Sequence, residues 1–116
     1  DECLFCRIAV GTVPAKVVFA DEEFVAFEDI QPQAPVHLLL IPRRHLPGLN
    51  DLAPDDDALF GRLGLLARRL AHERGLAEAG YRIVVNSGPD AGQSVFHLHL
   101  HLLGLSLIHI SEPTRL

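Results

Sequence analysis

Leucines recur at helical spacing in the middle of the chain. Between Asp55 and Arg74 they are separated by steps of four, three and four residues, at Leu59, Leu63, Leu66 and Leu70. This spacing places them on one face of an amphipathic helix. Pro54 suits the first turn and Gly75 suits a C-terminal cap, so the pattern predicts one long helix between these limits.

The other apolar positions form short runs that alternate with polar residues or end at Pro, Gly and acidic turns, which is typical of β-strands. The predicted strands are residues 17–20, 24–28, 36–41, 81–86 and 94–103. A short helix over residues 3–9 is predicted to precede them. One long helix cannot supply the crossovers of a parallel sheet. The pattern therefore predicts an α+β fold with an antiparallel sheet, one long helix and a short N-terminal helix.

Length and charge narrow the possible functions. The chain has 116 residues, which suits one domain, with 48% hydrophobic residues and a formal net charge of -5. An acidic chain has no basic field to attract polyanions, so we expect no nucleic-acid partner. The apolar runs are too short to span a bilayer and the N-terminus lacks the pattern of a signal peptide. We therefore expect no membrane partner and a cytoplasmic location.

Histidines alternate with leucines near the end of the chain, at His97, His99 and His101. On an extended strand the three histidines would share one face. Imidazoles so close together cannot all be protonated cheaply, so neutral nitrogens are expected near physiological pH. A neutral imidazole can attack phosphorus and form a phosphohistidine-type intermediate while its neighbours donate hydrogen bonds to phosphoryl oxygens. A metal site and a solvated polar strand face are the alternative interpretations.

The loop before this strand favours the nucleophilic interpretation. Residues 87–94 read Ser-Gly-Pro-Asp-Ala-Gly-Gln-Ser, which combines flexible glycines with polar donors. Glycine permits close approach of the backbone, as binding of a phosphate group requires. Such a loop is common by itself, but its position directly before three histidines indicates a phosphate site.

Cys3 and Cys6 are separated by two residues, a spacing that suits half of a metal site. A disulfide is disfavoured in a reducing cytosol, and a thioredoxin-like redox pair needs a strand before it and a helix after it. The sequence shows no such arrangement, so a metal site is the preferred interpretation.

The segment from Gly92 to Leu103 resembles the signature of the histidine-triad (HIT) family and is most similar to its Hint branch. The resemblance continues upstream through the cysteines, Phe27-Glu28-Asp29-Ile30 and Pro35-Val36-His37, and it covers about residues 2–104. We therefore assign residues 1–104 to one HIT domain.

The resemblance implies a homodimer of α+β subunits that hydrolyses or transfers nucleoside monophosphates through a nucleotidyl-histidine intermediate. The implied substrates are purine nucleoside phosphoramidates, acyl-adenylates or related conjugates of purine nucleotides. The Fhit-like branch, whose members hydrolyse dinucleoside polyphosphates, has glutamine where this chain has His101. That difference favours the Hint branch, and dinucleoside polyphosphate hydrolysis is kept as an alternative.

The resemblance also implies roles for individual residues. His99 matches the nucleophile, and His37 matches the histidine that hydrogen-bonds to it and orients it. Asp29 matches the acceptor for the ribose hydroxyls, and Ile30 matches a wall of the base pocket. The further matches are the catalytic phosphate contacts His101 and Ser94, the latter also near the leaving group, and the substrate contacts Gln93, Gly92 and Asn86.

A zinc site is implied as well, because Cys3, Cys6, His45 and His97 match the four ligands found in some bacterial relatives. Two thiolates and two imidazoles form a closed tetrahedral site of the structural type. His97 would then serve the metal more than the substrate, and zinc would hold the N-terminal segment against the catalytic strand. In the alternative interpretation the cysteines are ordinary buried thiols and His45 is a surface residue.

The resemblance ends at Gly104. Relatives continue with a second glycine and an arginine and reach a tryptophan-proline-proline ending, which residues 105–116 do not have. We hypothesise that this segment is foreign sequence from a misread or chimeric gene end, which sequencing of the source gene through the junction would test. A rival to the enzyme interpretation is a zinc-stabilised nucleotide-binding or adaptor module with little turnover.

Overall fold

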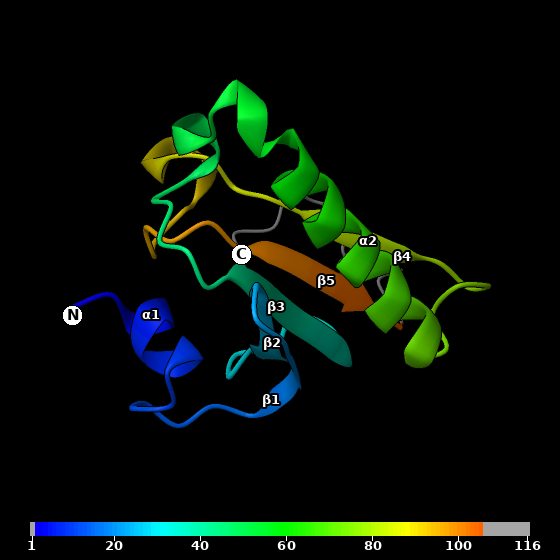
Figure 1. Cartoon of the computed structure of the whole chain (residues 1–116). Helices are drawn as coiled ribbons and strands as arrows, with labels where there is room; N and C mark the ends of the chain where they lie inside the picture. Colours follow the sequence, from blue (N-terminus) through cyan, green and yellow to red (C-terminus); the bar gives the residue numbers. More distant parts are fainter. Residues whose placement is uncertain (1, 106–116) are drawn as a thin grey trace.

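The computed structural model describes residues 2–105, which form an α+β fold (Figure 1). In chain order its helices and strands are α1 (Leu4–Ala9), β1 (Val17–Ala20), β2 (Phe24–Glu28), β3 (Val36–Pro42), α2 (Asp57–Glu73), β4 (Tyr81–Val84) and β5 (Leu100–Gly104). Short 3-10 turns lie at Leu49–Asp51, Pro54–Asp56 and Pro89–Ala91. The strands make one five-stranded sheet in the order β1-β2-β3-β5-β4, with every neighbouring pair antiparallel. The predicted fold class is confirmed.

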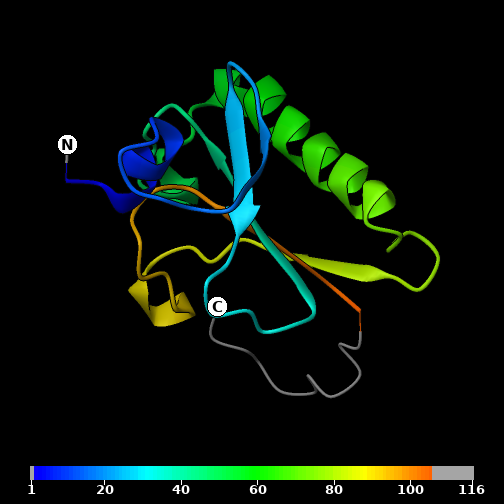
Figure 2. The same cartoon turned by 90° about the horizontal axis from the view of Figure 1, so that it is seen from below.

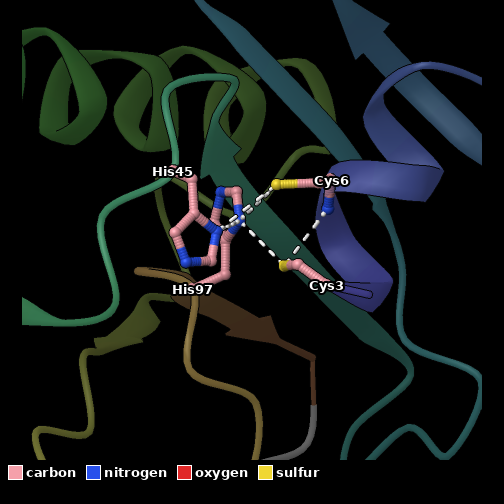
Figure 3. Close-up of side chains that lie close together, drawn as sticks. All are labelled: Cys3, Cys6, His45 and His97. Carbon is pink, nitrogen blue, oxygen red and sulfur yellow. Dashed lines mark hydrogen bonds between the residues drawn. The ribbon is translucent and has the colours of Figure 1, made fainter. Parts of the chain in front are cut away.

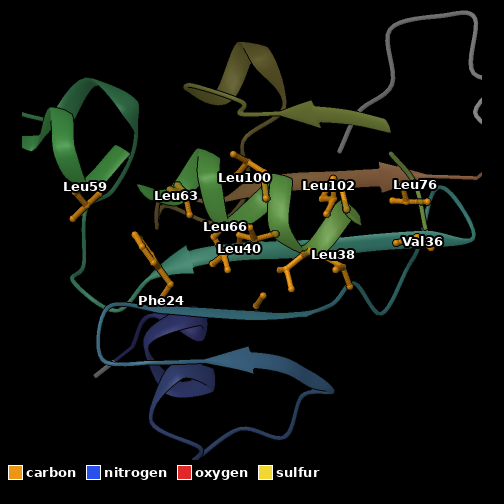
Figure 4. Packing of buried hydrophobic residues seen from close by; sticks show 14 residues of the cluster. Phe24, Val36, Leu38, Leu40, Leu59, Leu63, Leu66, Leu76, Leu100 and Leu102 are labelled. Atoms are coloured by element: carbon orange, nitrogen blue, oxygen red, sulfur yellow. The ribbon is translucent and has the colours of Figure 1, made fainter. Parts of the chain in front are cut away.

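The long helix α2 lies across one face of the sheet and covers the main core (Figures 1 and 4). Because side chains alternate along a strand, Leu38 and Leu40 of β3 point into this core. The leucines predicted to share one helical face are all buried here, at Leu59, Leu63, Leu66 and Leu70.

A smaller core lies on the opposite face, where Leu39 and Ile41 of β3 meet Phe5 and Ile8 of α1. Both faces of β3 are therefore covered, and every one of its residues is buried. Figure 2 shows α1 and α2 apart, on the two sides of the strands. The sheet thus has a large core under α2 and a small one under α1.

The last strand is shorter than predicted, because β5 begins at Leu100 and residues 94–99 approach it as irregular chain. The register of β3 with β5 pairs Leu40 with Leu100, so Leu98 would stand opposite Pro42. Proline has no backbone N–H for a ladder hydrogen bond. The Leu98 N–H instead donates to the carbonyl of Leu46, at 2.6 Å. The predicted strand 94–103 is therefore too long at its start, and of the three histidines only His101 lies within β5.

Other boundaries also differ slightly from the prediction, in α1, β3, α2 and β4. Helix α2 begins at Asp57 because Pro54–Asp56 forms a 3-10 turn, and β4 ends at Val84 rather than Asn86. No described helix is long and apolar enough to cross a membrane. Of the atypical C-terminal segment, residues 106–116 lie outside the described part of the chain.

Candidate active site and metal centre

A pocket of about 330 Å³ opens beside β3 and β5 on the face of the sheet that carries α1. One end of the pocket is apolar and is lined by Leu4, Phe5, Ile8, Val13, Phe27 and Leu39. The other end is polar and is lined by Asp29, His37, Ser94, His99 and His101. An apolar cavity with a few converging polar groups has the character of a small-molecule site.

His99 lies at the junction of the two ends. Its Nδ1 donates a hydrogen bond of 2.7 Å to the carbonyl oxygen of His97. A carbonyl can only accept, so in the neutral imidazole the proton is on Nδ1 and Nε2 keeps a free lone pair. Burial lowers the pKa of His99 below its ordinary value, which favours this neutral form. His99 can therefore act as a nucleophile through Nε2.

His37 and His101 form a second ordered pair. The backbone N–H of Gln33 donates to His37 Nδ1 at 3.0 Å, which places the His37 proton on Nε2. This Nε2–H donates to His101 Nδ1 at 2.9 Å. His37 thus hydrogen-bonds to His101, whereas the sequence resemblance implied a hydrogen bond to His99. The reason is the sheet register, which sets β3 beside β5 and brings the His37 and His101 rings to 5.2 Å.

The same chain of hydrogen bonds fixes the tautomer of His101. Because its Nδ1 accepts from His37, the neutral ring carries its proton on Nε2. Within the described residues this Nε2 is the one buried side-chain nitrogen or oxygen without a hydrogen-bond partner. Burial, followed by the nearby His99 and His37, lowers the pKa of His101 to about 3. A neutral N–H donor is thus buried in the pocket wall and lacks an acceptor.

The expected sugar and base contacts lie at the pocket mouth. Asp29 is held beside His37, with Oδ2 3.4 Å from His37 Nε2 and Oδ1 accepting from the Gln31 N–H at 2.8 Å. Ile30 is 91% exposed at the rim, so it is available to pack against a ligand. Ser94 is exposed and lines the pocket near the histidines.

Gln93 is not directed into the pocket, in contrast to the implied phosphate contact. Its side chain is buried, its Nε2 donates to the carbonyls of Pro47 and Val95, and its Oε1 accepts from the Gly88 N–H. These hydrogen bonds, 2.8 to 3.1 Å long, consume its polar groups within the loop. Gln93 therefore shapes the loop rather than offering a free donor.

Two other implied contacts are also absent from the pocket lining. Gly92 has a positive φ of 95°, a backbone conformation that favours glycine, at the end of the Pro89–Ala91 turn. Asn86 is partly buried just beyond β4. Neither residue lines the pocket, so both lie behind the residues that face a ligand.

The sequence interpretation missed the contribution of α1 to the pocket. Leu4, Phe5 and Ile8 line its apolar end, and the Phe5 ring meets the His99 ring edge-on at 5.0 Å between centroids. Their spacing along a predicted helix was a signal that they share a face. Which part of the sheet this face covers depends on tertiary packing, which no local pattern encodes.

The four expected metal ligands converge behind α1 (Figure 3). His97 Nδ1 lies 3.3 Å from Cys3 Sγ, 3.5 Å from Cys6 Sγ and 3.2 Å from His45 Nδ1. Cys6 Sγ is 3.3 Å from His45 Nδ1. With zinc bonds of about 2.3 Å to sulfur and 2.0–2.1 Å to nitrogen, tetrahedral ligand atoms are separated by roughly 3.3–3.8 Å. The donor set and its spacing therefore fit zinc.

A hydrogen bond to the backbone orients His97 within the metal centre. His97 Nε2 donates to the Pro42 carbonyl at 2.7 Å, which leaves Nδ1 as the lone-pair atom facing the cysteines. His97 is fully buried and does not line the pocket. The three histidines of the sequence pattern therefore divide, with His97 at the metal centre and the other two at the pocket.

A second group of possible ligands, Asp29, His37 and His101, is close enough to surround a cation. The tautomer of His37 opposes this interpretation, because its Nδ1 already accepts from Gln33 and its Nε2 carries the proton. A nitrogen that bears a proton has no lone pair for a metal. We therefore interpret this group as a hydrogen-bond network.

Comparison with known proteins gives one family. A family model described as "HIT domain" matches residues 10–106. Protein HitA of Neisseria gonorrhoeae is 44% identical over 104 residues, which are 90% of this chain and 96% of that protein.

Solved structures with the same fold agree with this match. A HIT family hydrolase from Legionella pneumophila Philadelphia 1 superimposes with a TM-score of 0.88 and 51% identity, over 89% of this chain and 92% of that one. A zinc-bound histidine triad family protein from Mycobacterium smegmatis has a TM-score of 0.79 and 34% identity, over 98% of this chain and 85% of that one.

Proposed function

The chain belongs to the HIT domain family, and from this premise we propose that it hydrolyses or transfers nucleoside monophosphates through a nucleotidyl-histidine intermediate. We further propose that its substrates are phosphoramidate or acyl-phosphate conjugates of purine nucleotides. The name of the Legionella relative, a HIT family hydrolase, supports the hydrolytic part of the proposal.

One observation carries the proposal most strongly. His99 offers a free Nε2 lone pair in the same pocket where His101 holds a buried N–H without an acceptor. An unsatisfied buried donor is costly and calls for a functional explanation. A phosphoryl oxygen would accept a hydrogen bond from this N–H. The same hydrogen bond would stabilise the negative charge that develops on the phosphate in the transition state.

The reaction follows from these two nitrogens. His99 Nε2 attacks phosphorus, the bond from phosphorus to the leaving nitrogen or oxygen breaks, and the leaving group departs with a proton from solvent or Ser94. Water then attacks the phosphorus of the nucleotidyl-histidine and gives up a proton to solvent or to the Ser94 oxygen. The bond to Nε2 breaks, and nucleoside monophosphate is released. His101 Nε2–H donates to a phosphoryl oxygen in both steps, and His37 holds His101 in the required tautomer.

The rest of the pocket fits a nucleoside. Asp29 is positioned at the rim to accept hydrogen bonds from ribose hydroxyls. The apolar end, between α1 and Phe27, offers dispersion contacts to a flat purine ring.

Zinc is the proposed cofactor, held by Cys3, Cys6, His45 and His97. The zinc-bound relative from Mycobacterium smegmatis supports this assignment. A closed site with four protein ligands supplies a structural cross-link and leaves no open position for substrate. The chemical step therefore relies on the side chains of the pocket alone.

The catalytic proposal is tested by comparing wild type with His99→Ala on adenosine phosphoramidate. Loss of the nucleophile is expected to reduce the release of adenosine monophosphate by ~10³-fold or more. His72→Ala is the matched control, because His72 is exposed on α2 and its ring hydrogen-bonds to the Arg68 carbonyl, away from the pocket. Equal release by wild type and His99→Ala would contradict the assignment and favour a binding or adaptor module.

The same assay separates the two enzyme branches. If the chain is of the Hint type, kcat/KM is higher for adenosine phosphoramidate than for diadenosine triphosphate. The opposite order would favour dinucleoside polyphosphate hydrolysis. Both substrates must pass through His99, so His99→Ala is expected to be inactive on each.

We also propose that the chain forms a homodimer. Strand β4 is an edge of the sheet, and it exposes Tyr81 and Ile83, the latter at 49%. A free edge with exposed apolar side chains is a surface that a second chain can pair with. Sedimentation equilibrium measures the mass directly, and a monomer at micromolar concentration would contradict this proposal.

A further inference from the structure

Helix α1 separates the metal centre from the substrate pocket, and each site uses a different side of it. We infer that occupancy of the metal centre sets the affinity and reactivity of the pocket, with Phe5 as the positioning residue that links His97 to His99. This inference rests on the proposed function, because it concerns how nucleotide binding at that pocket is controlled.

Helix α1 has weak intrinsic stability. It has only six residues, Leu4–Ala9, and isolated helices shorter than about 12 residues are marginal in water. Its buried side chains are Phe5 and Ile8, which pack into the small core rather than under α2. A metal bound through Cys3 and Cys6 would add a cross-link that holds α1 on the sheet.

Phe5 lies between the two cysteines in the chain and contacts both histidines. Its ring lies 6.0 Å from the His97 ring and 5.0 Å from the His99 ring, in edge-on arrangements at 64° and 89°. The centroid of the Phe5 ring also lies 5.4 Å from that of the Phe27 ring. Phe5 therefore touches a metal ligand and the nucleophile at once, and movement of α1 changes the packing of both rings.

A backbone hydrogen bond also links the same two histidines. The His97 carbonyl accepts the hydrogen bond that places the proton on His99 Nδ1. His97 is itself held between the cysteine sulfurs and the Pro42 carbonyl. A metal that fixes His97 thus fixes the group that orients His99.

Helix α1 also forms a wall of the pocket. Leu4, Phe5 and Ile8 line the apolar end, whereas none of the four ligands lines it. A nucleotide in the pocket and a metal behind α1 both stabilise the same docked position of this helix. Two ligands that favour one state must strengthen each other's binding by the same factor.

The direct test measures the affinity of adenosine monophosphate by isothermal titration calorimetry for the zinc-loaded chain and for the chelator-treated chain. We expect the dissociation constant to be about 10-fold larger without zinc. Reciprocity predicts that saturating adenosine monophosphate raises the zinc affinity by the same factor, measured by competition with a chromophoric chelator. Equal nucleotide affinities in both forms would overturn the inference alone. No binding to the zinc-loaded chain would overturn the proposed function, and the inference with it.

The second test keeps zinc bound and replaces Phe5, the residue that links His97 to His99. Phe5→Leu retains an apolar wall but loses the ring contacts to His97 and His99, so kcat on adenosine phosphoramidate is expected to fall about 10-fold with KM changed less than about 2-fold. Phe60→Leu is the matched control, because Phe60 packs on the main core under α2. An unchanged kcat in Phe5→Leu, with one zinc still bound per chain, would overturn the inference even if the zinc-free chain unfolds.

Discussion

At the scale of single residues, Gln93 organises the loop that precedes the active histidines. Its amide donates to the carbonyls of Pro47 and Val95 and accepts from the N–H of Gly88. The side chain thus joins three separate backbone positions inside a buried space. It sets the course of the chain immediately before Ser94, which faces the pocket.

Gln93→Ala is expected to destabilise the protein by about 1–3 kcal/mol, because it removes the hydrogen bonds of a buried side chain to three part-buried backbone groups. Gln93→Glu is the matched variant, since it keeps an acceptor for Gly88 but loses both donor hydrogens. Chemical denaturation of both variants measures the effect. A Gln93→Ala variant as stable as wild type would contradict this account of the side chain.

At the scale of elements, the end of β5 is packed against the segment after α2. A Cβ atom built at Gly104 would lie 2.4 Å from Leu76 Cδ1 and 2.9 Å from its Cγ. Leu76 is fully buried in the main core, so it has little room to move (Figure 4). The absence of a side chain at Gly104 is therefore required for α2 and β5 to meet at this distance.

Gly104→Ala is expected to lower the free energy of unfolding by about 1–3 kcal/mol through overpacking. A double-mutant cycle with Leu76→Ala tests the cause, because the combined loss should be smaller than the sum of the two single losses. Gly64→Ala, on α2 with no atom within 4 Å of its Cβ, is the control and is expected to stabilise by ~0.5–1 kcal/mol. If the losses in free energy of unfolding from Gly104→Ala and Leu76→Ala were additive, a clash between the new Cβ and Leu76 would be excluded.

At the scale of the whole molecule, folding buries several histidines in neutral form. The pKa values of His37, His97, His99 and His101 are all lowered, with burial as the largest cause of each. In the unfolded chain a histidine takes up a proton near its ordinary pKa of 6.5. The folded chain resists that protonation, so acid favours unfolding.

The pKa of His101 is 6.5 in the unfolded chain and about 3 in the folded one. Above pH 6.5 the residue is neutral in both states and its protonation does not lower the stability. As the pH falls from 6.5 toward 3, the free energy of unfolding decreases by up to about 1.4 kcal/mol per pH unit. Urea unfolding of His101→Gln between pH 6 and 4 should therefore show a pH slope shallower than that of wild type by about this amount. His72→Gln, at an exposed position, should leave the slope unchanged. Identical slopes for wild type and His101→Gln would refute the buried neutral state.

The leucine period of α2 and the short apolar runs of the strands were sufficient to predict the element types and the antiparallel sheet. Residues 94–99 were assigned wrongly because their alternation suits a strand, whereas Pro42 on the neighbouring strand removes the ladder partner. That effect depends on the register between two distant segments. Local patterns contain no information about it.

The sequence by itself determined the fold class and the position of the histidine cluster, because residue type and periodicity carry these features. Its resemblance to the HIT family supplied the candidate zinc ligands. Only the tertiary structure decided which histidine bonds to which, since tautomers depend on donors such as Gln33 N–H. It also turned Gln93 away from the pocket and set Phe5 against His99. Each of these outcomes arises from contacts between segments far apart in the chain, which form only when the sheet and its two cores assemble.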